Sequence, residues 1–331
     1  MNPLERVALG RTDLRVTRLG VGGTPLGGLY TDVTEEAASA TMERALSLGL
    51  NFFDTAPLYG SGKSETRMGR VFAKHPRSSF VVATKVGFKL VPIDPKSNED
   101  IFFPFDNAPP LRPANDYTYE GTMRSVEQSM KRLQVDCLDI AHIHDPEGLF
   151  DDAMQGSYQA LRKLRAQGVI KAVSAAMNQV EMLARFAREG EFDCFLLAAR
   201  HTLLEQQAFK ELFPLCAKKK ISLIIGAPYS SGILATGPIP GAKFRYLDAK
   251  PEILEKVRQI EAVCRDHAVP LKAAALQFAL CHPATATVIP GGGSVAEVED
   301  NFRMLSHPIP PELWTGLQRR GLLPQVELQF P

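Results

Sequence analysis

The segment NFFDTAPLYGSGKSETRMG, residues 51–69, joins a short apolar run to a polar loop and then to a helical pattern. Residues 51–55 are typical of a buried strand, and the helical pattern begins near Lys63. Asp54 stands at the carboxyl end of this strand, and Tyr59 lies on the loop that follows. Because parallel sheets are built from strands followed by crossover helices, the segment predicts an α/β fold.

The same unit repeats along the chain. Short apolar runs alternate with amphipathic helical stretches, and eight runs are strand candidates: 19–22, 51–55, 80–85, 138–144, 170–175, 194–198, 221–226 and 286–290. Thr34, followed by two glutamates, has the pattern of a helix N-cap. Eight such units fit a closed (β/α)8 TIM barrel, and an open doubly wound sheet is the main alternative. Residues 7–16 predict a β-hairpin before the first unit.

Length and composition limit the classes of protein. The chain has 331 residues, of which 45% are hydrophobic, and we expect one domain over residues 1–331. A net charge of +1 favours neither a nucleic-acid nor a membrane partner. The N-terminus has no signal-peptide pattern, which predicts a cytoplasmic protein. The five cysteines form no C-x-x-C pair, which favours reduced thiols, and the oligomeric state is left open.

Polar residues stand at the carboxyl ends of the predicted strands, which is where barrel enzymes place their catalytic residues. Asp54, Lys85, His144 and Asn178 each lie at or just past the carboxyl end of a predicted strand. A tyrosine with a pKa of about 10 is a weak acid or base at neutral pH, but a neighbouring ammonium group lowers that pKa. A carboxylate can hold the ammonium group, and an imidazole can orient a substrate oxygen. Together with Tyr59, these residues therefore suit carbonyl reduction or its reverse.

Three motifs resemble those of the aldo-keto reductase superfamily. They are DTAPLYGSGKSETRMG at residues 54–69, VATKVG around Lys85 and LDIAHIHDPEG around His144. The resemblance covers nearly the whole chain and implies a (β/α)8 barrel with a nicotinamide cofactor at its mouth. It also implies a catalytic tetrad of Asp54, Tyr59, Lys85 and His144. Within the superfamily, FDTAPLYGSGKSE, IHDPEG and VIPGGGSVAEVEDN are most similar to L-fucose/D-threo-aldose 1-dehydrogenases, and also to pyridoxal 4-dehydrogenases and L-galactose dehydrogenases.

Further binding positions are expected on the strand-end loops, and for the grip on the nicotinamide carboxamide the resemblance implies Asn178. The cofactor is expected to contact Gly23, Thr24, Asp54, Asn178, Tyr229, Ser231, Gly232, Gly291, Gly292, Glu297 and Asn301. The substrate is expected to contact Tyr30, Tyr59, Phe105 and His144. A plain tight turn is the alternative for Gly23 and Thr24. The usual cofactor-stacking tyrosine and strand-six glutamine align with Gly226 and Ala198, so the residue that stacks on the nicotinamide ring is left open.

The eighth strand bears on the choice of cofactor. Superfamily members that prefer NADP carry Lys after an Ile-Pro pair and Arg six residues later, whereas Gly291 and Glu297 stand here. A carboxylate accepts a hydrogen bond from a ribose 2′-hydroxyl and repels a 2′-phosphate. The sequence therefore predicts NAD. An exposed residue in the first turn of a helix is the alternative interpretation of Glu297, and both can hold together.

Two rival chemistries are disfavoured. Residues 57–64 nearly match a phosphate-binding loop, but Pro57 stands where the first glycine is required. His142 and His144 form an H-x-H pair like that of metal-dependent hydrolases, yet no second histidine cluster accompanies it, so we expect no metal. We expect His142 to be a hydrogen-bonded residue one layer below the site. A barrel that only binds, with little turnover, is a third class.

Residues 88–117 break the regular spacing after the third strand. The segment is long, shows no periodicity, and contains several prolines together with Phe102, Phe103 and Phe105. This composition favours an ordered flap over the barrel mouth.

From the tetrad, the resemblance and the eighth strand together, we predict NAD-dependent oxidation of an aldose at C1 to its lactone, with pyridoxal oxidation to 4-pyridoxolactone as the alternative. A general aldehyde or ketone reductase is a remoter possibility.

Overall fold

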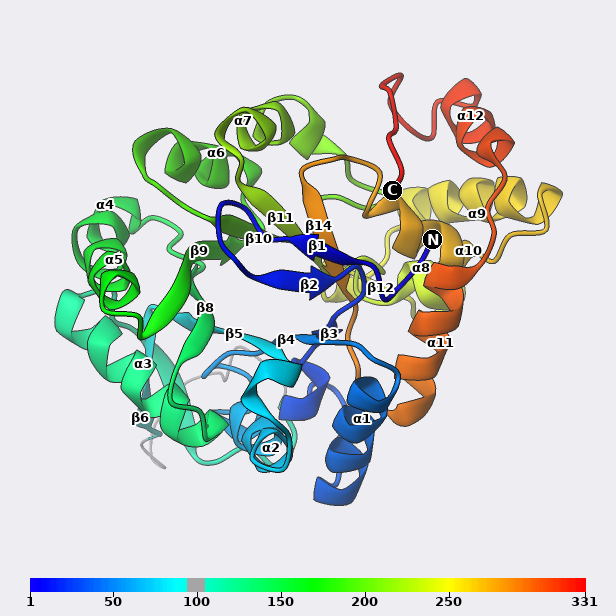
Figure 1. The fold of residues 1–331 in the computed structure, drawn as a ribbon. Coiled ribbons are helices and arrows are strands. Elements are labelled where there is room, and N and C mark those ends of the chain that lie inside the picture. Colours follow the sequence, from blue (N-terminus) through cyan, green and yellow to red (C-terminus); the bar gives the residue numbers. More distant parts are fainter. Residues whose placement is uncertain (94–104) are drawn as a thin grey trace.

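The computed structural model describes residues 1–93 and 105–331. Eight parallel strands form one sheet, and helices surround it as a ring (Figure 1). In sheet order the strands are β14 (Thr285–Ile289), β11 (Ser222–Gly226), β10 (Cys194–Ala198), β9 (Ile170–Met177), β8 (Leu138–His144), β5 (Val81–Val86), β4 (Phe52–Asp54) and β3 (Val21–Gly22). The predicted strands therefore all form, with small differences at their ends.

The two outer strands of this order also meet. The Gly22 amide donates to the Pro290 carbonyl at 2.9 Å, and the Gly20 amide donates to the Val288 carbonyl at 2.9 Å. These bonds join β3 to β14 and close the sheet into a (β/α)8 barrel. The prediction of a barrel is confirmed, and the open-sheet alternative is wrong.

The helices follow the strands along the chain. Their bounds are α1 (Glu35–Ser47), α2 (Lys63–Phe72), α3 (Tyr119–Leu133), α4 (Phe150–Asp152), α5 (Tyr158–Ala166), α6 (Val180–Glu189), α7 (Leu212–Lys219), α8 (Ile233–Thr236), α9 (Pro251–Asp266), α10 (Leu271–Phe278), α11 (Val295–Ser306) and α12 (Pro311–Arg319). Short helical turns lie at η1 (Pro25–Gly27), η2 (Arg77–Ser79), η3 (Ala153–Ser157) and η4 (Gln207–Phe209). Thr34 caps α1 as predicted, because its side chain accepts from the Ala37 amide at 3.2 Å.

The predicted N-terminal hairpin consists of β1 (Arg6–Ala8) and β2 (Arg15–Thr17). It lies across the barrel end that faces the viewer in Figure 1. Leu9, Leu14 and Val16 are buried in a cluster with inward-facing strand residues such as Phe52 and Ile140. This apolar cluster fills the amino end of the barrel, which leaves the carboxyl ends of the strands for polar chemistry.

The segment after β5 differs from the sequence prediction. Its described ends form an antiparallel ribbon of β6 (Phe88–Pro92) and β7 (Leu111–Asn115), although no periodicity predicted strands there. Such a ribbon tolerates proline because each strand has an outer edge where an N–H is not needed. Phe102 and Phe103 lie outside the described residues. A second small ribbon, β12 (Lys243–Phe244) and β13 (Leu247–Asp248), follows β11 and α8.

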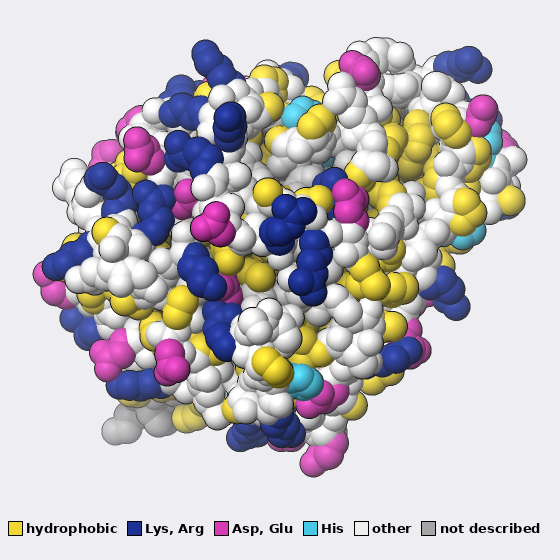
Figure 2. All heavy atoms as spheres, viewed as in Figure 1, with side chains coloured by type: hydrophobic (Ala, Val, Ile, Leu, Met, Phe, Trp, Pro, Cys, Tyr) yellow, Lys and Arg dark blue, Asp and Glu magenta, His cyan; other side chains and the backbone are white. Residues whose placement is uncertain are grey.

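The surface and the thiols carry further information. Figure 2 shows Lys and Arg side chains mingled with Asp and Glu over the face that bears the β1–β2 hairpin. Within residues 1–93 and 105–331, no helix has both the length and the apolar character needed to cross a membrane. All five cysteines are free, and all except Cys137 are buried.

Gly10 in the β1–β2 turn provides a test of how closely the hairpin packs on the amino end of the barrel. Its φ is +56°, and a Cβ there would lie 1.9 Å from the Asp193 backbone oxygen. We expect Gly10→Ala to lower the free energy of unfolding by about 2–4 kcal/mol, through backbone strain and this clash. Gly168→Ala is the matched control, because its φ is +75° and its Cβ would meet nothing within 4 Å. Equal losses in urea unfolding would contradict the importance of the Asp193 contact.

Candidate functional site

The four residues of the predicted tetrad come together at the carboxyl ends of β4, β5 and β8. Lys85 Nζ donates to Asp54 Oδ1 at 2.5 Å and to the Thr55 backbone oxygen at 2.7 Å. The same Nζ lies 4.8 Å from the centre of the Tyr59 ring. The Tyr59 and His144 rings meet edge to face, with centroids 6.2 Å apart. The structure therefore assembles these side chains into one compact cluster.

Burial makes the charges of this cluster interdependent. Asp54 and Lys85 are 2% and 1% exposed. Burial is the largest influence on Asp54 and opposes its ionisation, but Lys85 and His142 together outweigh it and lower the pKa of the carboxyl group below its usual value. Burial is also the largest influence on Lys85 and opposes its charge, but Asp54 and Tyr59 together outweigh it and raise the pKa of the ammonium group. The two groups thus hold each other in their charged forms.

The pKa of Tyr59 differs from the sequence expectation. Lys85 does act to lower it, and hydrogen bonds from the Thr24 and Lys85 side chains act in the same direction. Burial is the largest influence, however, and the pKa of Tyr59 lies above its ordinary value. Burial, followed by the charge of Lys85, lowers the pKa of His144 well below its usual value. Tyr59 is therefore protonated and His144 is neutral at physiological pH.

Asp145 is a site residue that the sequence reasoning missed. Its Oδ2 lies 3.5 Å from His144 Nε2, and its side chain is 42% exposed. Partial burial raises the pKa of the Asp145 carboxyl group to about 6. Tyr117 OH donates to the backbone oxygens of His144 at 2.5 Å and of Asp145 at 2.9 Å, which holds this strand end in place. The motif IHDPEG contained the signal, because Asp145 directly follows His144.

Aromatic side chains rim the site. The Phe88 ring centre lies 5.6 Å from that of His144, and the Phe105 ring centre lies 6.5 Å from that of Tyr59. The described ends of residues 88–117 therefore lie over the site, as predicted for a flap. Tyr30, with a φ of +64°, is 51% exposed on the loop after β3. Tyr246 on the loop after β11 interacts electrostatically with both Tyr30 and Tyr59, so these loops converge at the mouth.

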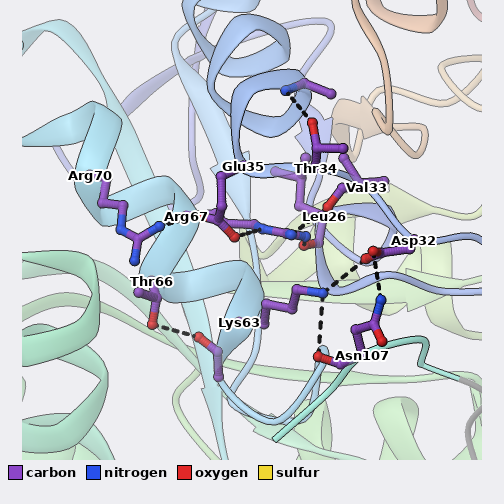
Figure 3. Close-up of polar contacts among 12 residues, drawn as sticks. Leu26, Asp32, Val33, Thr34, Glu35, Lys63, Thr66, Arg67, Arg70 and Asn107 are labelled. Atoms are coloured by element: carbon purple, nitrogen blue, oxygen red, sulfur yellow. Dashed lines mark hydrogen bonds and ion pairs between the residues drawn. The ribbon is translucent and has the colours of Figure 1, made fainter.

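Polar contacts tie the rim loops to α2 (Figure 3). Arg67 donates to the Leu26 backbone oxygen at 2.6 Å and to Glu35 Oε1 at 2.8 Å. Lys63 Nζ lies 3.1 Å from Asp32 Oδ1, and Asn107 Nδ2 donates to Asp32 Oδ2 at 2.7 Å. Lys63 is also the first residue of α2. It therefore anchors the rim loops, in keeping with the helix-start interpretation rather than a phosphate-binding loop.

Several predicted cofactor residues cluster beside β14. Tyr229 OH donates to Asn301 Oδ1 at 2.7 Å, and Asn301 Nδ2 donates to the Gly291 backbone oxygen at 3.2 Å. Glu297 Oε2 accepts from the Gly293 amide at 2.8 Å, while the Glu297 amide donates to Ser294 Oγ at 3.2 Å. Ser294 thus caps the start of α11, and the Glu297 side chain reaches back to the residue before the cap. Glu297 is therefore an exposed residue in the first turn of α11, which is the alternative interpretation that the sequence offered.

The other predicted cofactor residues lie on neighbouring loops. The Gly23 amide donates to the Asp54 carbonyl at 2.8 Å, which places the Gly23–Thr24 turn against the tetrad. The Asn178 carbonyl accepts from Arg200 Nε at 3.2 Å. Ser231 Oγ accepts from the Tyr246 amide at 3.1 Å, and Gly232, with a φ of +98°, begins α8. Gly292 packs closely, because a Cβ there would lie 2.8 Å from Val21 Cγ1.

The pattern of the Aldo/keto reductase family matches residues 18–319. The chain belongs to this family. Pyridoxal 4-dehydrogenase of Microbacterium luteolum is 36% identical, covering 96% of this chain and 98% of its own. D-threo-aldose 1-dehydrogenase of a Pseudomonas species is 35% identical, covering 94% and 96%. L-galactose dehydrogenase of Arabidopsis thaliana is 29% identical, covering 91% and 88%.

Solved structures show the same fold. A Bacillus halodurans aldo-keto reductase in its holo form superposes with a TM-score of 0.78 at 23% identity, covering 96% of each chain. Glycerol dehydrogenase of Gluconobacter oxydans superposes with a TM-score of 0.75 at 21% identity, covering 98% of this chain and 99% of its own. The chain is thus an oxidoreductase with an aldo/keto reductase barrel, and family membership implies a nicotinamide cofactor.

The groups beside β14 fit such a cofactor. The glycines at 291–293 leave little side-chain bulk before α11, whose N-terminus favours an anionic phosphate. The Tyr229 and Asn301 side chains border the same loop through their hydrogen bonds. Among residues 1–93 and 105–331, no group of three His, Cys, Asp or Glu side chains is placed to hold a metal ion.

Tyr59→Phe tests the tetrad of this aldo/keto reductase. The substitution keeps the ring but removes the transferable proton, so we expect kcat to fall by about 10²–10⁴. Cofactor affinity, measured by fluorescence titration, should stay within about threefold. Tyr158→Phe is a matched control, since its hydroxyl accepts from the Glu191 amide at 2.6 Å on the outer helical layer. Near-normal turnover of Tyr59→Phe would exclude Tyr59 as the acid/base.

The pH dependence follows from the pKa directions. With Tyr59 as the expected acid/base, oxidation requires its deprotonated form, and because the pKa of Tyr59 is raised, kcat/KM for oxidation should rise about tenfold per pH unit between pH 7 and 9. Reduction requires protonated Tyr59 and should be nearly constant over that range. His144 adds no titration there, because its pKa is lowered well below its usual value. An oxidation plateau beginning below pH 8 would show that the pKa of Tyr59 is depressed.

Proposed function

We propose that this aldo/keto reductase is an NAD-dependent dehydrogenase that oxidises an aldose at C1 to its lactone, with residues 1–331 acting as one barrel domain. The observation that carries the proposal is the buried cluster of Asp54, Lys85 and Tyr59 beside His144. The 35% identity to a D-threo-aldose 1-dehydrogenase supports an aldose as substrate.

The residues of the site have distinct roles in this reaction. Tyr59 acts as a phenolate, which the charge of Lys85 stabilises, and it becomes a neutral phenol when it takes the proton from the C1 hydroxyl of the cyclic sugar. Asp54 keeps Lys85 charged and in place. His144, as a neutral imidazole, orients the same substrate oxygen. A nicotinamide cofactor held beside β14 would supply the oxidised ring as the hydride acceptor for C1.

Asp145 supports a substrate that carries several hydroxyl groups. Its carboxylate is partly exposed and lies 3.5 Å from His144 Nε2, the nitrogen expected to face the reacting oxygen. With a pKa of about 6, Asp145 is mostly ionised above neutral pH. A carboxylate there can accept hydrogen bonds from hydroxyls next to C1, which a simple aldehyde does not offer.

Pyridoxal is the second candidate substrate. The 36% identity to a pyridoxal 4-dehydrogenase favours it as strongly as the other relative favours an aldose. The cyclic hemiacetal of pyridoxal presents a hydroxyl-bearing carbon like C1 of a sugar, so Tyr59 and His144 would serve in the same way. The aromatic rim of Phe88 and Phe105 suits a flat ring as well as a sugar face.

A substrate panel tests both candidates. L-fucose, other aldoses and pyridoxal are each assayed with NAD and with NADP at the absorbance of the reduced nicotinamide. We expect the highest kcat/KM with an aldose and NAD. A higher kcat/KM with pyridoxal would select the second candidate. Absence of turnover with every aldose and with pyridoxal would contradict both.

The preference for NAD is proposed from the start of α11. One oxygen of the Glu297 carboxylate accepts a hydrogen bond from the Gly293 amide, so a 2′-phosphate cannot use that amide. The other oxygen of the Glu297 carboxylate can accept from a ribose 2′-hydroxyl. A 2′-phosphate would face a negative charge instead. At about 4 Å and an effective dielectric near 20, repulsion is a few kcal/mol before solvent and side-chain rotation reduce it.

Charge reversal tests this preference. We expect the unmodified protein to favour NAD by about 10- to 100-fold in kcat/KM, equivalent to ~1–3 kcal/mol. Glu297→Arg with Gly291→Lys should shift the preference towards NADP, whereas Glu297→Ala should only weaken it. The Glu297→Arg single variant is measured as well, because a side chain at position 291 would approach Pro25 Cγ at 3.0 Å. Equal use of both cofactors by the unmodified protein would contradict the role of Glu297.

A further inference from the structure

A second polar contact reaches Asp54 from below the tetrad. His142 stands two residues before His144 on β8, so both side chains face the barrel interior. His142 is completely buried. Its Nδ1 lies 2.7 Å from Ser174 Oγ on the adjacent strand β9, and its Nε2 lies 3.3 Å from Asp54 Oδ2. The imidazole therefore stands between a hydroxyl group and the carboxylate of the tetrad.

The two atoms that face each other have no better partner. His142 Nε2 and Asp54 Oδ2 are buried, and neither makes another hydrogen bond within residues 1–93 and 105–331. The other carboxylate oxygen, Oδ1, is occupied by Lys85 Nζ. A buried polar atom left unpaired costs about 1–3 kcal/mol. Since 3.3 Å is only slightly longer than a normal N–H···O bond, a small side-chain adjustment satisfies both atoms.

The Asp54 carboxylate favours one position of the ring proton of His142 over the other. Burial lowers the pKa of His142, so the ring is neutral and carries one proton. A proton on Nδ1 would leave the Nε2 lone pair against the carboxylate of Asp54. A proton on Nε2 is instead donated to Asp54, and Nδ1 then accepts from Ser174. Ser174 Oγ also donates to the Cys194 backbone oxygen at 2.8 Å, so this arrangement requires the hydroxyl proton to turn from Cys194 to His142 Nδ1.

We propose that His142 is a positioning residue of the reaction, which holds Asp54 through an Nε2–H bond so that Lys85 stays beside Tyr59. This inference rests on the proposed function. With a donor on each oxygen, the carboxylate plane is defined, whereas Lys85 alone would leave Asp54 free to turn. Any displacement of Asp54 moves Lys85 Nζ, which lies only 4.8 Å from the centre of the Tyr59 ring.

The titratable groups around His142 determine which pKa a pH profile of oxidation measures. Asp54 from β4 and Lys85 from β5 act on it electrostatically, and His144 lies on its own strand. Ser174 from β9 does not titrate, and the Cys194 thiol on β10 has its pKa raised by burial. The rise in oxidation rate above pH 7 therefore reports Tyr59, as modified by Asp54 and Lys85.

Three substitutions separate positioning from packing. His142→Gln keeps an amide N–H where Nε2 stood, His142→Asn reaches only the place of Nδ1, and His142→Leu offers neither. We expect kcat for oxidation to fall about 10- to 100-fold in the Asn and Leu variants, because the tetrad is misplaced. The Gln variant should stay within about threefold, and the KM for the nicotinamide cofactor should not change in any variant. The alkaline rise of oxidation should move to higher pH in the Asn and Leu variants and stay in place in the Gln variant.

Stability is measured in parallel with kinetics. Ile140→Val is the matched control, since Ile140 lies on the same inward face of β8 and belongs to the buried interior cluster. It should lose some stability without losing kcat. Normal kcat and pH profile in His142→Leu would overturn the proposal. Equal losses in Gln, Asn and Leu that follow their unfolding free energies would also overturn it, since they would show packing alone.

A spectroscopic measurement does not depend on turnover. Long-range 1H–15N spectra of the protein with 15N-labelled histidine, assigned with His142→Gln, should show the Nε2–H tautomer for His142 between pH 6 and 9. Asp54→Asn should shift that resonance. The Nδ1–H tautomer or an imidazolium form would overturn the proposal. Failure of the proposed function would appear differently, because the unmodified protein would then turn over neither aldoses nor pyridoxal. The His142 variants would in that case be compared with a carbonyl or alcohol substrate that this aldo/keto reductase does accept.

Discussion

The buried ion pair of Asp54 and Lys85 is the contact on which the candidate site depends. Neither charge would be stable alone at this depth, because removal from water costs each ion several kcal/mol. Their contact at 2.5 Å compensates that cost and fixes both side chains at adjacent strand ends. Tyr59 and His144 are then arranged around a fixed positive charge. That charge favours the phenolate of Tyr59 and disfavours the imidazolium of His144, so one pair influences both partners.

The barrel can hold this pair because its two ends differ in polarity. The β1–β2 hairpin places Leu9, Leu14 and Val16 over the amino ends of the strands, and the interior beneath the His142–Ser174 pair is apolar. Water is thereby excluded from beneath Asp54, while the carboxyl end stays accessible through the loops. Burial is also the reason that the pKa of Tyr59 is raised rather than lowered, since desolvation outweighs the neighbouring ammonium group.

The loops at the open end come from distant parts of the sequence. The turn at Tyr30, the ribbon β6–β7 and the loop that carries Tyr246 follow different strands, yet they converge over Tyr59. The contacts of Arg67 and Lys63 tie two of these loops to α2 (Figure 3). We therefore expect the assembly of loops to select the substrate and the side chains at the strand ends to carry out the chemistry.

The sequence by itself determined the barrel and the tetrad. Strand–helix alternation and polar residues at strand ends are local patterns, so Asp54, Lys85 and His144 could be placed before any coordinates. Only the tertiary structure decided the balance of burial against charge at Tyr59, the β6–β7 ribbon, the contact of Glu297 with the Gly293 amide, and the approach of His142 and Asp145 to the tetrad. Each of these depends on distances between segments that are remote in sequence, and neither periodicity nor spacing along one chain contains such distances.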